Sequence, residues 1–313
     1  MLDFGMASSH GRSLWRPAER FADTLKGYPA HLVEQFPETA GREASSLEYA
    51  QSLVSRIRTG FSTLRQQLAD YRPDVIIMVG DDQGDMFNSS NNPALAIYTG
   101  SEEMWGRAAF DPDIPAPERE KVVFQNHVEL SRHLCKELIK RDFDIASMAR
   151  FRPAGKPGVG ISHMVARTVP EVDPSGTIPI VCVFINEYYA PMPSARRCIA
   201  LGRAIAGILS ERPERAAIYA SGGLSHYPNT LLRGYVDIPL DTWILERLQR
   251  NDVAALEHLF AFDSDTQRAG TGEIRAWLTA AAAMNRKAEV IDYMPIHSGQ
   301  TGVAFAYWPQ TER

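Results

Sequence analysis

The stretch IPIVCVFI at residues 178–185 is an almost continuous apolar run rich in β-branched side chains, and a second such run, DVIIMVG, occupies residues 74–80. Runs of this kind are typical of strands that are buried on both faces of a sheet. Weaker strand patterns occur at residues 2–9, 94–98, 145–148, 216–220, 288–293 and 303–308. Together they predict a central sheet, mostly parallel or mixed, with helices packed against it.

Helices are predicted from the spacing of apolar residues at 45–71, 117–141 and 195–210 and over most of 241–284. Residues 117–141 begin with Pro-Glu-Arg-Glu and end near Lys-Arg, a charge order that suits the dipole of one long helix. Several prolines interrupt residues 14–39, where we expect loop with short helical pieces. Neither a linker nor a repeat divides the chain, so we expect one α/β domain over residues 1–313.

The composition excludes several classes of protein. Hydrophobic residues make up 44% of the 313 residues, charged residues 23%, and the net charge is −5, without the basic cluster that nucleic-acid binders carry. The start of the chain lacks a signal-peptide pattern, and no apolar stretch approaches the ~18 residues that span a membrane, so a cytoplasmic protein is expected. Cys135, Cys182 and Cys198 are widely spaced, which favours buried thiols over a disulfide framework or a Cys-x-x-Cys metal site.

Polar residues directly follow three of the predicted strands. They are His10, the group Asp81-Asp82-Gln83, and His226. In open α/β sheets, binding sites gather at the carboxyl ends of strands. One histidine at a strand end is more often structural than functional, but three such groups favour a shared site.

The Ser225-His226 pair follows Gly222-Gly223, whose freedom lets the backbone approach a ligand closely. A histidine in such a turn can act as an acid or base near neutral pH. A serine hydrolase is disfavoured because no Gly-x-Ser-x-Gly elbow occurs. Glu273 begins an amphipathic helix, either as a residue favoured by the helix dipole or as a metal ligand. Histidine and carboxylate ligands of this kind hold Fe(II) in facial triads.

Several blocks resemble the class III, LigB-type, extradiol ring-cleavage dioxygenases. MASSHG at 6–11 resembles the strand with the first iron histidine, and SGGLSH at 221–226 resembles the block with the acid/base histidine. GEIRAW at 272–277 resembles the block with the glutamate ligand. YYAP at 188–191 and RRCIALG at 196–202 resemble the intervening strand, loop and helix. The resemblance implies a LigB-like fold, Fe(II) bound by His10 and Glu273, and His226 as the catalytic acid/base.

Within the family, GDDQ at 80–83 and NPALAIY at 92–98 are most similar to the 3-O-methylgallate dioxygenase branch, which needs no small partner subunit. The family pattern places a second iron histidine where this chain has Gln83. A Gln carbonyl is a neutral oxygen donor, so we expect weaker iron binding unless Asp82 serves as an alternative ligand. The replacement of the second histidine by Gln83 also leaves open that this protein no longer binds iron. His163 is the only candidate for a second catalytic histidine that some relatives carry.

The resemblance implies an extradiol dioxygenase that opens a catechol- or gallate-type ring with O₂, in the catabolism of lignin-derived, 3-O-methylgallate-like aromatics. His226 would take a proton from the iron-bound diol, so activity requires a pH above its pKa. A homodimer is expected. The candidate substrate-binding residues are Arg12, Asn186, Tyr188 and Tyr227. Two alternatives remain: a catalytically altered LigB-fold metal-binding or signalling protein, and a metal-dependent hydrolase that activates a bound water.

Overall fold

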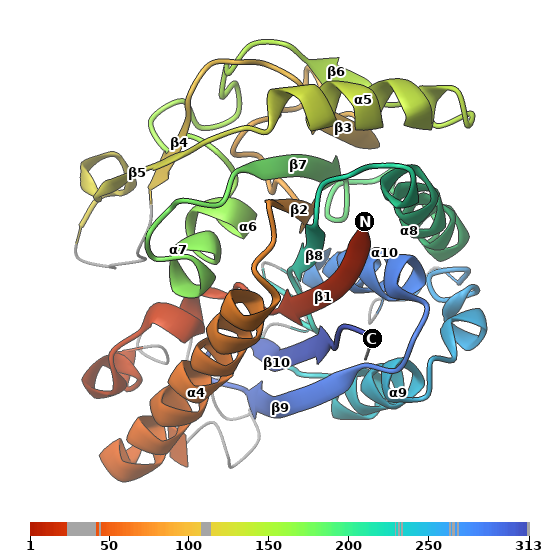
Figure 1. The fold of residues 1–313 in the computed structure, drawn as a ribbon. Helices are drawn as coiled ribbons and strands as arrows, with labels where there is room; N and C mark the ends of the chain where they lie inside the picture. Colours follow the sequence, from red (N-terminus) through yellow and green to blue (C-terminus); the bar gives the residue numbers. More distant parts are fainter. Residues whose placement is uncertain are drawn as a thin grey trace.

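The computed structural model describes residues 1–23, 42–43, 45–107, 114–228, 230, 232, 234–262, 264, 267 and 269–311. Its centre is an eight-stranded sheet in the order β6-β3-β7-β2-β8-β1-β10-β9 (Figure 1). The strands are β1 (Leu2–Ser8), β2 (Val75–Gly80), β3 (Leu95–Tyr98), β6 (Ala146–Met148), β7 (Ile180–Ile185), β8 (Ala216–Ser221), β9 (Glu289–Ile296) and β10 (Thr301–Trp308). The strands predicted from the apolar runs are all present.

The middle of the sheet is parallel. Strands β7, β2, β8 and β1 lie side by side in the same direction, whereas β3 pairs antiparallel with β7, and β10 pairs antiparallel with β1 and β9. The prediction of an α/β fold with a mixed central sheet is therefore confirmed. The prediction of a single domain over residues 1–313 stays a prediction.

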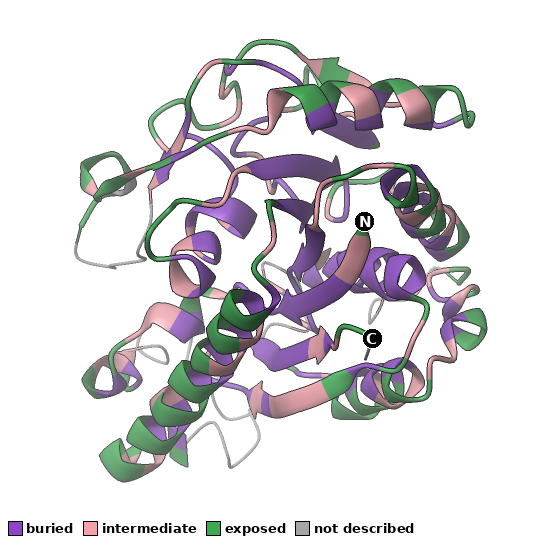
Figure 2. Cartoon of the chain, viewed as in Figure 1, coloured by how far each residue is buried: buried purple, intermediate pink, exposed green. Residues whose placement is uncertain are grey.

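Helices cover both faces of the sheet. They are α4 (Leu47–Tyr71), α5 (Val128–Ile139), α6 (His163–Ala166), α7 (Val169–Val172), α8 (Ala195–Ser210), α9 (Ile238–Gln249) and α10 (Ile274–Met284). Alternate residues of β2 enter two separate cores: Val75, Ile77 and Val79 pack with α5, α8 and α10, and Ile76 and Met78 pack with α4, α6 and α7. Figure 2 shows the result, with buried central strands and helices such as α4 whose outer surface is exposed.

Helix α10 is buried along its whole length, because it lies between the sheet and α8. Gly202 of α8 makes this close packing possible, since a Cβ atom there would lie 2.0 Å from the carbonyl oxygen of Thr279. The tight contact holds the start of α10, and with it Glu273, against the carboxyl ends of the strands.

Two of the predicted helices match the structure closely, and two do not. Residues 45–71 form α4, capped by Ser46, and 195–210 form α8. The prediction of one helix over 117–141 is wrong in its first half: a 3₁₀ turn (Ala116–Glu118) and strand β5 (Lys121–Phe124) precede α5. The β-branched pair Val122-Val123 favours a strand, and β5 pairs with β4 (Met104–Arg107) in a hairpin absent from the prediction.

Residues 241–284 are less helical than predicted, since α9 ends at Gln249 and α10 begins only at Ile274. Short 3₁₀ turns lie between them, at Val253–Leu256 and Ala269–Glu273. The 3₁₀ turns Arg12–Trp15 and Ala18–Arg20 agree with the short helical pieces predicted for 14–39, of which 24–39 lie outside the described residues. All three cysteines are buried and unpaired. Among the described residues, no helix has the length and apolar character to cross a membrane.

Candidate functional site

The polar residues that follow the strands meet at one edge of the sheet. His10 follows β1, residues 81–83 follow β2, and residues 222–226 follow β8, and these three strands are neighbours running in the same direction. Glu187 follows β7 at the same edge. The sequence placed His10, Gln83 and His226 at strand ends, and the structure brings them together around a residue from a helix, Glu273.

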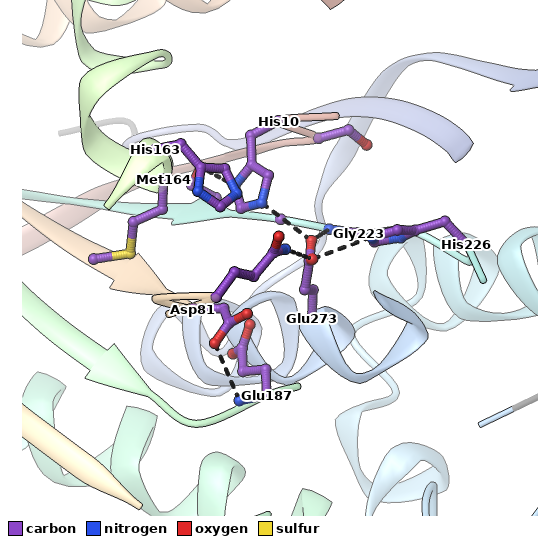
Figure 3. A network of polar contacts seen from close by, with 12 residues as sticks. His10, Asp81, His163, Met164, Glu187, Gly223, His226 and Glu273 are labelled. Atoms are coloured by element: carbon purple, nitrogen blue, oxygen red, sulfur yellow. Dashed lines mark hydrogen bonds and ion pairs between the residues drawn. The ribbon is translucent and has the colours of Figure 1, made fainter. Parts of the chain in front are cut away.

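Glu273 is the centre of this cluster, and its side chain is fully buried. One carboxylate oxygen, Oε2, lies 3.3 Å from His10 Nε2 and accepts a 2.6 Å hydrogen bond from the Gly223 backbone. The other, Oε1, lies 3.1 Å from His226 Nε2 and accepts a hydrogen bond from the Gln83 amide. Figure 3 shows His10 and His226 reaching Glu273 from either side. A single carboxylate therefore joins all the predicted ligand positions and the predicted acid/base.

The two glycines before His226 permit this geometry. Gly222 and Gly223 have φ values of 146° and 62°, which L side chains rarely adopt. Gly223 thereby turns its backbone N–H toward Glu273. Gly270 leaves room for the imidazole, since a Cβ atom there would lie 1.9 Å from His226 Nε2.

The charges of this cluster depend on one another. Burial by itself would raise the pKa of Glu273, but the neighbouring charges of His226 and His10 hold it well below the ordinary value. Burial would likewise lower the pKa of His226, but the Glu273 carboxylate outweighs burial and raises it. An ionised carboxylate is thus maintained in a fully buried position.

His10 is oriented like a metal ligand. Its Nδ1 atom lies 3.0 Å from the hydroxyl of Ser221, the last residue of β8, and this contact directs Nε2 toward Glu273. Nε2 is buried and has no hydrogen-bond partner among the described residues. A second polar group that fixes the other ring nitrogen is the usual companion of a metal-bound histidine.

His163, the first residue of α6, lies beside His10 with the ring centroids 4.5 Å apart. Its Nδ1 atom lies 2.8 Å from Asp85 Oδ2, and Asp85 also binds the Lys156 ammonium at 2.8 Å. Burial, followed by the charges of His10 and Arg167, lowers the pKa of His163 to about 4. Burial would raise the pKa of Asp85, but the two partners lower it. The Asp85 contact was not foreseen, although Asp85 lies only two residues after Gln83.

Asp82, the alternative ligand, has both carboxylate oxygens engaged by backbone N–H groups, those of Met86 at 2.7 Å and Phe87 at 2.9 Å. Burial raises its pKa to about 6. In this structure Asp82 therefore stabilises the turn after β2.

Two further carboxyl groups lie at this edge, Asp81 from the strand-end group named in the sequence and Glu187, which the sequence analysis missed. Asp81 and Glu187 are buried, and the Glu187 backbone N–H lies 3.4 Å from Asp81 Oδ1 (Figure 3). Burial raises the pKa of both carboxyl groups well above the ordinary values. The charges of Glu273 and Asp82 add to this effect at Asp81, and those of Asp81 and Glu273 add to it at Glu187. No local pattern marks Glu187, which follows β7 as Asp81 follows β2, so only strand adjacency could have paired them.

The predicted substrate-binding residues differ in their surroundings. Asn186 binds its own loop, donating to the carbonyl oxygens of Tyr189 at 2.6 Å and Pro191 at 3.0 Å. Burial and the negative charge of Glu273 raise the pKa of Tyr188, whose ring contacts that of Tyr189. Tyr227 is buried, and Arg12 is exposed on a 3₁₀ turn. The charge of Arg12 also acts on the Tyr188 hydroxyl, and a shared substrate subsite for the four residues stays a prediction.

The donor set determines which metal the cluster fits. Within the described part of the chain, no three His, Cys, Asp or Glu side chains form a group that could hold a metal ion by themselves. Two strong donors are present, the unpartnered His10 Nε2 and the Glu273 carboxylate, with the Gln83 amide beside them. Nitrogen and oxygen donors of these types suit Fe(II). His10 and Glu273 thus fit a divalent transition metal, and the Gln83 amide, whose nitrogen faces Glu273 here, is the weaker third group.

Residues 45–307 match the family described as the catalytic LigB subunit of aromatic ring-opening dioxygenase. Gallate dioxygenase of Pseudomonas putida is 30% identical over 185 residues, which cover 57% of this chain and 52% of that protein. The 2,3-dihydroxyphenylpropionate/2,3-dihydroxicinnamic acid 1,2-dioxygenase of Mycolicibacterium gilvum is 23% identical over 180 residues, which cover 57% of this chain and 51% of that protein. The chain thus spans about half the length of the curated relatives it matches.

One solved structure, of an uncharacterized protein from Escherichia coli K12, aligns with a TM-score of 0.49 and 14% sequence identity, covering 79% of this chain and 91% of that chain. Within the present chain, Gln83, His163, His226 and Glu273 lie inside the segment that matches the family, whereas His10 precedes it.

Proposed function

The chain belongs to the LigB family of catalytic subunits of aromatic ring-opening dioxygenases, as its motifs predicted, and from this we propose that it opens catechol- or gallate-type rings with O₂. The observation that carries the proposal is the buried Glu273 carboxylate between His10 and His226. A carboxylate kept ionised beside an unpartnered imidazole nitrogen is an arrangement suited to a divalent metal.

The proposed metal is a single Fe(II), held by His10 Nε2, the Glu273 carboxylate and the Gln83 amide oxygen. When bound, it would supply a place where the substrate diol and O₂ meet and exchange electrons. Gln83 would present its oxygen rather than its nitrogen to the metal, which requires only a rotation of the amide. The side-chain amide already lies in contact with Glu273.

His226 would handle the substrate proton. Its Nδ1 atom lies 2.9 Å from the Leu224 carbonyl oxygen, which makes Nδ1 a donor and leaves Nε2 as the nitrogen that exchanges protons. Nε2 faces Glu273, so a hydroxyl bound beside that carboxylate would lie within its reach. His163 would be the second acid/base residue, with Asp85 fixing its Nδ1 in the same way.

The test begins with anaerobic loading of the purified protein with Fe(II). Oxygen uptake and ring-opened product are then followed with gallate, 3-O-methylgallate and protocatechuate. His226→Ala should nearly abolish turnover with iron still bound, whereas His10→Ala and Glu273→Ala should lose the iron. The exposed His258→Ala is the matched control and should behave like the wild type. If the three site variants kept wild-type rates, the proposed roles would be wrong.

One observation favours a second candidate function. The third donor is the Gln83 amide, and a weaker ligand set is consistent with a LigB-fold protein that binds metal or a ligand without turnover. Iron bound in stoichiometric amount, with no oxygen uptake on any diol, would support this second function.

The first proposal, the ring-opening dioxygenase, also includes three further points. They are a 3-O-methylgallate-like substrate from lignin-derived catabolism, a homodimer and a cytoplasmic location.

A further inference from the structure

A cavity of about 740 Å³ lies between the loop after β2 and the loop after β7. Gln83 forms part of its wall, and the same Gln83 amide contacts Glu273. A ring whose two hydroxyls lay at Glu273 would therefore have room to extend past Gln83 into this cavity. Its volume is within the range of small-molecule sites, roughly 300–1,000 Å³.

The inner wall of the cavity is largely apolar. Phe87 and Phe184 lie edge to face, with ring centroids 5.6 Å apart and an interplanar angle of 87°. Ile185 and Pro191 continue the wall from the end of β7, and Tyr189 lines the rim with its half-exposed ring. Aromatic edges and aliphatic carbons favour another apolar or aromatic group, because burial of such surface stabilises the complex.

The charged groups of the cavity do not form an anion site. Lys156 is the cation among the described lining residues, and it is paired with Asp85 at 2.8 Å and donates to the Gln83 carbonyl at 3.2 Å. The carboxyl groups among the described lining residues are those of Asp81 and Asp82. A carboxylate entering this cavity would lose its hydration and would have to compete with Asp85 for the Lys156 ammonium.

We propose that this cavity receives an uncharged, largely apolar substituent of the substrate ring, of the alkoxy, alkyl or aryl class, and disfavours a carboxylate at the same ring position. The inference rests on the proposed ring-opening function and specifies its substrate. It confines any acidic group of the substrate to the part of the ring that points away from Gln83.

The test compares four diols on the iron-loaded protein: catechol, 3-methoxycatechol, 3-phenylcatechol and 2,3-dihydroxybenzoate. We expect kcat/KM for the methoxy and phenyl compounds to exceed that of catechol by about 10-fold or more, the gain typical of filling an apolar pocket. The carboxylate should fall below catechol. Equal or better turnover of 2,3-dihydroxybenzoate than of 3-phenylcatechol overturns the inference and leaves the ring-opening function standing.

Affinity for the diols, measured without oxygen, tests the ring-opening function and the substituent preference of the cavity separately. Calorimetric binding of the same four diols under anaerobic conditions should give the same order of preference. If catechol and its derivatives neither bind nor turn over, both the function and the inference fail. If they bind without the predicted order, the inference alone fails.

A matched pair of variants tests the place of the substituent. Asn92 lines the cavity, and its exposed neighbour Asn91 does not. Asn92→Trp should reduce the ratio of kcat/KM for 3-phenylcatechol to that for catechol by about 10-fold, because the indole occupies cavity space. Asn91→Trp should leave this ratio unchanged. A ratio that responds equally to both, or to neither, contradicts the assignment.

Discussion

Gly270 offers a direct way to displace the proposed acid/base without removing any ligand. A Cβ atom on Gly270 would lie 1.9 Å from Nε2 and 2.1 Å from Cδ2 of His226, whereas non-bonded carbon atoms are separated by roughly 3.5–4 Å. Gly270 is not among the residues with a positive φ, so its backbone accepts alanine. Gly270→Ala therefore requires the imidazole of His226 to move by more than about 1 Å.

The magnitude follows from that displacement. A misplacement of about 1 Å at a catalytic group costs on the order of 10²-fold in rate, or roughly 2.7 kcal/mol in activation free energy. The iron ligands are unchanged, so iron content should equal that of the wild type. Gly207→Ala is the control: nothing lies within 4 Å of its added Cβ on α8. That variant should keep full activity and gain up to about 1 kcal/mol of stability.

The assay measures kcat/KM for ring opening with anaerobically loaded protein, together with iron content. The imidazole resonances of His226, observed by NMR in the iron-free protein, report the displacement whether or not the protein turns over. Wild-type kcat/KM in Gly270→Ala, with an unchanged His226 resonance, would refute the packing described for this loop.

Ser221→Ala removes the group that orients His10, and should weaken iron binding about 10–100-fold while secondary structure, measured by circular dichroism, stays unchanged. Gln83→His should tighten iron binding in the same titration, because imidazole is expected to be the stronger donor; weaker binding would argue against a ligand role for Gln83. Asp241 accepts a hydrogen bond from the Ser225 hydroxyl, and burial raises its pKa from 3.8 to about 7. The protonated carboxyl therefore stabilises the fold below pH 3.8, and this contribution, up to about 4 kcal/mol, is lost as pH rises through about 7. Asp241→Asn should flatten that part of the pH dependence of urea unfolding, and an unchanged curve would contradict the raised pKa.

Local pattern was sufficient for most of the fold. The β-branched runs at 74–80 and 178–185 correspond to β2 and β7, because a strand covered on both faces has no polar alternation. The error in the prediction for 117–141 arises from pairing between separate segments, which local pattern does not describe. Residues 121–124 form a strand because β4 offers them backbone partners, and the β-branched pair Val122-Val123 is too short a signal to predict that pairing.

The candidate site likewise contains residues that the sequence could identify and contacts that only the tertiary structure shows. His10, Gln83 and His226 could be nominated from sequence because each directly follows a strand, and Glu273 because it begins a helix in a family-like block. The pairing of His163 with Asp85, and the burial of Asp81 beside Glu187, depend on which strands are neighbours.

The sequence alone determined the identity of most elements, the order of the motifs and the residue types available for chemistry, because these depend on local periodicity and on side-chain composition. Only the tertiary structure decided that one carboxylate, Glu273, receives His10, His226, Gly223 and Gln83 together. The physical reason is that desolvation and charge pairing act through space. The strand order and the close packing of α10 on α8 bring each of these groups into direct contact with the Glu273 carboxylate, and no spacing along the chain encodes that arrangement.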